Sequence, residues 1–124
     1  MITIKKILQK IKNMQTETIT NENGTAIKFA DGTMICTLQT KVTDQAINGA
    51  YGNLFQGTRV WDFPVAFIET PSVTCGCFQW GTGASWGGIR GISSTSVTLR
   101  GYDIASRSTG TETTISAIAI GRWK

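Results

Sequence analysis

The spacing of hydrophobic residues changes once along this chain of 124 residues. Over residues 2–14, apolar side chains recur every three or four positions, which predicts one amphipathic helix. From Ile27 onwards apolar and polar residues alternate, as in strands that bury one face. Residues 15–25 are polar and rich in turn formers, and they predict a linker. We therefore expect a helix and linker over residues 1–22 and a β-domain over residues 23–124.

The apolar residues of the helix fall on the a and d positions of a heptad, and they are Ile4, Ile7, Ile11 and Met14. Isoleucine at both positions favours bundles of three or more helices. Two heptads are too short to associate alone. Either the β-domain trimerises as well, or the helix is the stub of a longer stalk. The alternative is a short helix that packs on its own domain.

The β-domain is expected to contain six or seven short strands. Asp31-Gly32 predicts a two-residue hairpin turn after Ile27 and Phe29. Further strands are predicted at residues 33–42, 59–63, 72–80, 89–92, 95–102 and 113–123, with a loop at 44–58. The segment 113–123 is apolar on both faces and should be a central strand. The fold class predicted is all-β, an antiparallel β-sandwich with a short N-terminal coiled-coil helix, assembled as a homotrimer.

Two strands carry more specific expectations. In the strand 33–42, Met34, Cys36 and Leu38 should share one face. In the strand 72–80, strict alternation places Val73, Cys75 and Cys77 on one face and Phe78 and Trp80 on the other.

Composition narrows the classes of function. The chain has no histidine, which removes the commonest general base and metal ligand, so we expect no catalytic residue, no metal and no cofactor. Four of the twelve basic residues lie before residue 16 and all eight acids lie after it, so residues 16–124 carry no net charge and nucleic-acid binding is not expected. No apolar run is long enough to insert into a membrane. Three cysteines leave one unpaired, and we expect buried thiols rather than disulfides.

Large aromatic residues at strand ends and in loops are the best candidates for ligand contacts. Rings of this kind stack on the apolar faces of sugars, while neighbouring polar side chains bind the hydroxyl groups. The glycine-rich segment 81–88 lacks the Lys-Ser/Thr ending of a phosphate loop and places Trp86 in the open. The candidate ligand-binding residues are Trp86, Arg90, Tyr102, Asp103, Tyr51 and Asn53. Each aromatic could instead fill the core or form a subunit contact, and we expect one of these roles for Trp61 and Trp123.

Three motifs resemble those of C-terminal domains of bacteriophage tail fibres. Their first hairpin resembles residues 23–36, NGTAIKFADGTMIC. Their W-x-[FY]-P-x-x-F-x-x-x-P-x-V segment resembles residues 59–73, RVWDFPVAFIETPSV. Their chain terminus is similar to residues 115–124, ISAIAIGRWK. The F-x-x-x-P-x-V part is also similar to the H-type lectin sandwich, a trimeric fold that binds sugars. Some fibre tips bind iron through rings of histidine, but this chain contains no histidine and departs from them in this respect, so no metal is expected at its tip.

The resemblance implies a tail-fibre tip of a phage or prophage that recognises a bacterial surface receptor, a glycan or a protein, without catalysis. Its implied partners are two further copies of the chain and upstream fibre or baseplate proteins. Its implied location is the virion, after synthesis in the cytoplasm of the bacterial host. Two rival interpretations remain: a purely structural part that trimerises and caps the fibre, and a fragment of a polysaccharide-degrading enzyme.

Overall fold

The computed structural model describes residues 3–14 and 16–124. The predicted helix is present as α1 (Ile4–Met14). The strands that follow are β1 (Glu17–Asn21), β2 (Gly24–Lys28), β3 (Thr33–Val42), β4 (Gly49–Tyr51), β5 (Leu54–Asp62), β6 (Ser72–Trp80), β7 (Trp86–Ile92), β8 (Ser96–Asp103) and β9 (Thr113–Arg122). Among the described residues, no helix combines the length and the hydropathy needed to cross a membrane.

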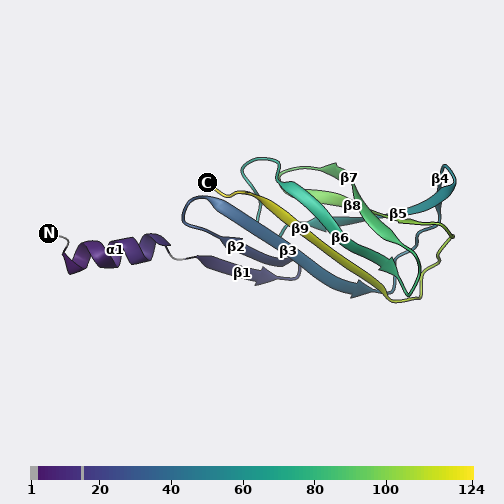
Figure 1. Cartoon of the computed structure of the whole chain (residues 1–124), viewed down its shortest axis with the longest axis horizontal. Helices are drawn as coiled ribbons and strands as arrows, with labels where there is room; N and C mark the ends of the chain where they lie inside the picture. The colour runs from purple at the N-terminus through teal and green to yellow at the C-terminus, as the bar shows by residue number, and fades with distance from the viewer. Residues whose placement is uncertain (1–2, 15) are drawn as a thin grey trace.

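The strands form two antiparallel sheets that face each other, as Figure 1 shows, so the predicted β-sandwich is confirmed. One sheet has five strands in the order β1-β2-β3-β9-β6, and the other has four in the order β4-β5-β8-β7. The last strand, β9, lies between β3 and β6, which is the central position expected from its two apolar faces.

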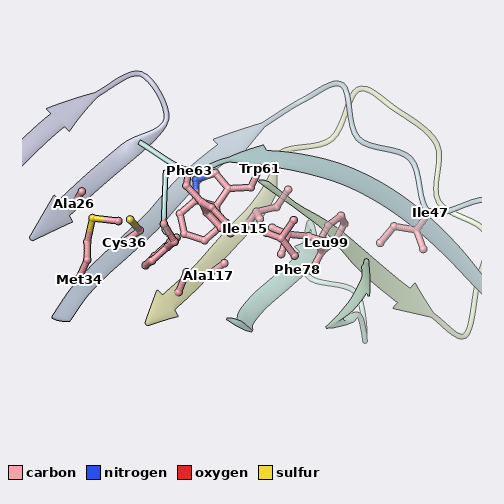
Figure 2. Close-up of a cluster of buried hydrophobic side chains, with 13 residues drawn as sticks. Ala26, Met34, Cys36, Ile47, Trp61, Phe63, Phe78, Leu99, Ile115 and Ala117 are labelled. Atoms are coloured by element: carbon pink, nitrogen blue, oxygen red, sulfur yellow. The ribbon is translucent and has the colours of Figure 1, made fainter. Parts of the chain in front are cut away.

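The core between the sheets is built from side chains of both sheets that face inward, and along each strand these alternate with side chains that face outward (Figure 2). Met34 and Cys36 are fully buried and Leu38 packs against the same core, as the alternation predicts. Trp61 is also buried, and its indole Nε1 donates a hydrogen bond of 2.7 Å to the carbonyl of Asn23. Trp123 is partly buried against the core. Both tryptophans therefore pack with the core, which is one of the two roles expected of them.

The alternation in β6 differs from the prediction because the strand contains a bulge. Its register against β9 shifts between Cys75 and Cys77, and the extra residue there is Gly76. Cys75 therefore faces the core, and Phe78 faces it too, opposite Ile115. Cys77 pairs with Ser116 on the outer face instead. The prediction that Cys77 shares a face with Cys75 was wrong, because it assumed an unbroken strand.

Two segments expected to be irregular are hairpins. Residues 15–25 were predicted to be a linker, but β1 and β2 pair from Glu17↔Lys28 to Asn21↔Gly24, so the sheet begins earlier than expected. Within residues 44–58, β4 pairs with the start of β5. The hairpin predicted at Asp31-Gly32 is present with a longer turn, in which the Phe29 N–H bonds the Thr33 carbonyl and Gly32 has φ +99°.

The helix α1 extends away from both sheets (Figure 1). Its apolar residues Ile4, Ile7 and Leu8 are exposed by 76%, 46% and 60%. The alternative in which the helix packs on its own domain is therefore not observed. The side chains of Ile11 and Met14, the other two predicted heptad residues, lie outside the part of the chain that the structure describes.

Candidate ligand-binding site

Three connections meet at the end of the sandwich farthest from α1 (Figure 1). They are the β3–β4 connection at 43–48, the β6–β7 connection at 81–85 and the β8–β9 connection at 104–112. Ile47 and Arg107 exchange two backbone hydrogen bonds of 2.9 Å, and the Gly110 N–H donates to the Thr43 carbonyl at 2.8 Å. The free end of the molecule is therefore a group of loops that support one another.

A buried carboxylate connects two of these loops. The Oδ2 atom of Asp103 accepts hydrogen bonds from Ser85 Oγ at 2.6 Å and from Arg107 Nε at 3.0 Å, while Oδ1 accepts from the Ala105 N–H at 2.9 Å. Burial opposes its ionisation, but these three hydrogen bonds together hold the pKa of Asp103 below its ordinary value. Asp103 was a candidate ligand contact. The structure makes it a support beneath the loops instead, because its side chain has no exposed surface.

Beside this end, three aromatic rings lie on the outer face of the four-stranded sheet; we call Tyr51, Trp86 and Tyr102 the aromatic platform. Trp86 and Tyr102 are register partners whose ring centroids lie 5.7 Å apart with 24° between the planes. The Tyr51 ring lies 5.7 Å from Tyr102 at 54°. Trp86 is 44% exposed and Tyr51 49%. Three of the six candidate residues are thus brought together from strands far apart in sequence.

Glycine makes room for the platform. A Cβ atom at Gly88 would lie 3.1 Å from Cε2 of Tyr102, closer than side chains normally approach. The absence of a side chain at this position of β7 therefore lets the tyrosine ring lie beside the strand.

Two polar residues of the same face were not among the candidates. Arg100 lies two residues before Tyr102 in β8, and its Cζ atom is 5.1 Å from the centre of the Tyr51 ring. Gln56 is the register partner of Tyr102 in β5. The Gln56 Oε1 and Arg100 Nε atoms are buried without a hydrogen-bond partner in the described residues. The period-two pattern of β8 could have identified Arg100, whereas Gln56 stood in a segment interpreted as a loop.

The remaining two candidates lie at the margin of the platform. Asn53 is exposed in the turn between β4 and β5, two residues after Tyr51. Arg90 is exposed at the register shift of β7 between Ile89 and Gly91. Neither makes a ring or hydrogen-bond contact with Tyr51, Trp86 or Tyr102 in the described structure.

Two further kinds of reactive group matter for a functional site: clusters of metal ligands and reactive cysteine thiols. No three His, Cys, Asp or Glu side chains gather within the described ranges as a metal site would need. Cys36, Cys75 and Cys77 are free thiols, and burial raises the pKa of Cys36 and of Cys75 to about 11. These two thiols stay protonated near neutral pH and are poor nucleophiles.

The molecule is thus an antiparallel β-sandwich that carries a projecting helix at one end and supported loops with an aromatic platform at the other. Two solved structures share this fold over 98% of the chain. One is a C-terminal part of the R1 pyocin fibre of P. aeruginosa, with a TM-score of 0.63 and 16% identity. The other is an N-truncated R1-type pyocin tail fibre, with a TM-score of 0.64 and 15% identity.

The chain spans 32% of the length of the first of these structures and 98% of the second. At this level of identity the likeness establishes the fold, which is that of a tail-fibre C-terminal fragment, as the sequence motifs predicted. No protein-family model matches the sequence, and a search of curated proteins finds no match. The similarity to H-type lectins stays a prediction.

Proposed function

We propose that this chain forms the tip of a phage or prophage tail fibre and recognises a carbohydrate on the bacterial surface without catalysis. The observation that supports this best is the position of the aromatic platform. It lies beside the end opposite α1, on a fold shared with tail-fibre fragments. In a fibre whose shaft continues from α1, that end points toward the host cell.

The chemistry of the platform suits a sugar. The faces of Trp86 and Tyr102 are nearly parallel, so a pyranose ring can stack on the exposed tryptophan. Arg100 makes no ion pair with a carboxylate in the described residues, and its guanidinium can donate to hydroxyl or acidic groups of the sugar. Gln56 adds a nearby amide that can act as donor or acceptor.

Assembly of three copies through α1 would present three such sites in parallel. The exposed stripe of Ile4, Ile7 and Leu8 supports this, because an isolated helix of this length is marginal in water without a partner. On a cell surface that repeats the same glycan, three weak sites act together and raise the apparent affinity. Upstream fibre or baseplate proteins would join at the α1 end. The protein would be made in the host cytoplasm and carried in the virion.

The test is Trp86→Ala in the full chain, measured by attachment to whole cells of candidate hosts and by binding to their purified surface glycans. Loss of one stacking aromatic should weaken each site by roughly ten- to hundredfold. Trp86→Phe, which keeps a flat ring, should retain most of the binding. Val60→Ala is a matched control, because Val60 is exposed on the outer face of the same sheet.

Three outcomes would overturn parts of the proposal. Unchanged attachment by a folded Trp86→Ala variant would remove the platform from the binding site. Failure of the wild-type protein to bind any candidate host would favour the purely structural cap. Release of new reducing ends from surface polysaccharide by the wild-type protein would show catalysis, as expected of the enzyme alternative.

A further inference from the structure

The outer face of the five-stranded sheet carries a set of branched apolar side chains, and two of them, Ile118 and Ile120, are left exposed by the described part of the chain. The register aligns Thr18, Ile27, Ile35, Ile120 and Ser72 in one row across all five strands. The next row consists of Thr20, Thr25, Thr37, Ile118 and Thr74. Ile118 and Ile120 are 38% and 46% exposed. Exposed hydrophobic residues grouped in this way mark an interaction surface.

These two rows contain no charged side chain. The charged residues of β3 and β9 on this face are Arg122 and Lys41, which lie at opposite ends of the pair of strands. Arg122 donates to the Asp31 carbonyl at 2.7 Å, and Lys41 pairs with Glu112 at 3.5 Å. A surface of this kind can be buried against another protein without removing an unpaired charge from water.

The face is also not flat. At the bulge of β6, a shallow hollow of about 170 Å³ opens on this side, lined by Thr74, Gly76, Ser116, Ala117 and Ile118. An isoleucine of a facing surface offers a side chain of the right kind to enter such a hollow.

We propose that this face, formed by β2, β3, β9 and β6, is the surface through which copies of this chain pack against one another. The face is about four strands wide and ten residues long, on the order of 600 Å² at ~4.8 Å between strands and ~3.3 Å per residue. This approaches the roughly 800 Å² per partner of a stable interface, and the exposed apolar stripe of α1 adds to it. The helix leads directly into β1 of the same sheet, so one assembly can bury both surfaces.

A second copy is favoured over a different protein because the two rows carry no charge that would repel the same rows of another copy, and because the exposed apolar residues of α1 precede the same sheet. Turning this sheet inward also leaves the opposite sheet, with Tyr51, Trp86 and Tyr102, on the outside of the assembly. The inference adds an interface to the proposed function, but it does not require that the platform binds sugar.

The test compares two lysine substitutions in the full chain by sedimentation equilibrium at micromolar concentration. Ile120→Lys places a charge in the proposed interface and should raise the dissociation constant of the assembly by at least about 100-fold. Val60→Lys is the matched control, since Val60 is a 62% exposed branched residue on the outer face of the other sheet. It should leave the assembly unchanged. Circular dichroism checks that both variants keep the fold, which exposed positions permit.

A third variant, Ile7→Lys, separates the sheet from the helix. If Ile7→Lys dissociates the protein while Ile120→Lys does not, the helix alone holds the copies and the proposal is wrong. A monomeric wild-type protein at these concentrations would also overturn the proposal, because the exposed face would then have to bind a different protein. Loss of glycan binding by an intact oligomer bears only on the proposed function, so the two failures can be told apart.

Discussion

The buried carboxylate of Asp103 offers a sharp test of how the loop end is held together. The change is Asp103→Asn, which keeps the size of the side chain and removes its charge. The new amide can still accept from the Ala105 N–H and can still bond Ser85. In the wild type, Arg107 Nε–H donates to Asp103 Oδ2 at 3.0 Å. In the variant an NH₂ group takes the place of Oδ2, and because it is itself a donor it cannot accept this hydrogen bond.

The loss of unfolding free energy expected for Asp103→Asn follows from the burial of Asp103 and Arg107. The Asp103 side chain is fully buried and that of Arg107 is only 23% exposed, so the arginine loses a partner that water replaces poorly. Breaking one charged hydrogen bond of this kind costs about 2–3 kcal/mol of unfolding free energy. For a domain of this size that lowers the Tm by roughly 6–15 °C.

The effect should depend on pH in a definite direction. The folded protein holds the pKa of Asp103 below the ordinary value of 3.8, so the carboxylate stabilises the fold above that pH. This stabilisation is lost as the pH falls through the folded-state pKa. The difference in stability between wild type and Asp103→Asn should therefore be full at pH 7 and shrink below about pH 4.

Urea denaturation followed by tryptophan fluorescence, at pH 7 and at pH 3, measures both the loss of unfolding free energy and its dependence on pH. Asp62→Asn is the control, because Asp62 is exposed and its substitution should change the unfolding free energy by less than about 0.5 kcal/mol. Equal stability of wild type and Asp103→Asn at pH 7, or a difference that grows at pH 3, would refute the reasoning.

Three further predictions concern the helix, the core and the thiols. Deleting residues 1–15 should leave a folded body by circular dichroism, since the sandwich has its own core, but weaken self-association in sedimentation; an unfolded product would contradict this. Gly101→Ala should cost about 1–3 kcal/mol in urea denaturation, because an added Cβ overlaps the Phe78 ring, and a neutral result would be unexpected. Cys36 and Cys75, with pKa values near 11, should resist iodoacetamide at pH 8 until the protein unfolds, as mass spectrometry can check.

Much of the fold could be predicted because its signals are local. The three-to-four spacing of Ile4 and Ile7 indicates a helix wherever the segment sits, and Asp31-Gly32 favours a hairpin through the backbone freedom of Gly32. Alternation predicted the inward face of β3. The two apolar faces of β9 predicted that it would be central. These patterns act within a few residues, so no knowledge of distant contacts was needed.

The candidate site was only partly accessible in this way. Aromatic residues near strand ends predicted Tyr51, Trp86 and Tyr102, but only the pairing of β7, β8 and β5 places the rings together. Tyr102 and Asp103 are adjacent in sequence and face opposite sides of the sheet, so one joins the platform and the other is buried.

The sequence by itself determined that the chain begins with a helix, where β3, β6, β8 and β9 begin, which residues of β3 face inward and that the chain forms a β-sandwich. The tertiary structure alone decided that Gly76 forms a bulge and turns Cys77 outward, and that residues 17–21 join the sheet. It also brought Arg100 and Gln56 to the platform and gathered three loops at one end. The reason is physical: alternation states which side chains share a face, whereas register and loop position depend on hydrogen bonds between strands far apart in the chain.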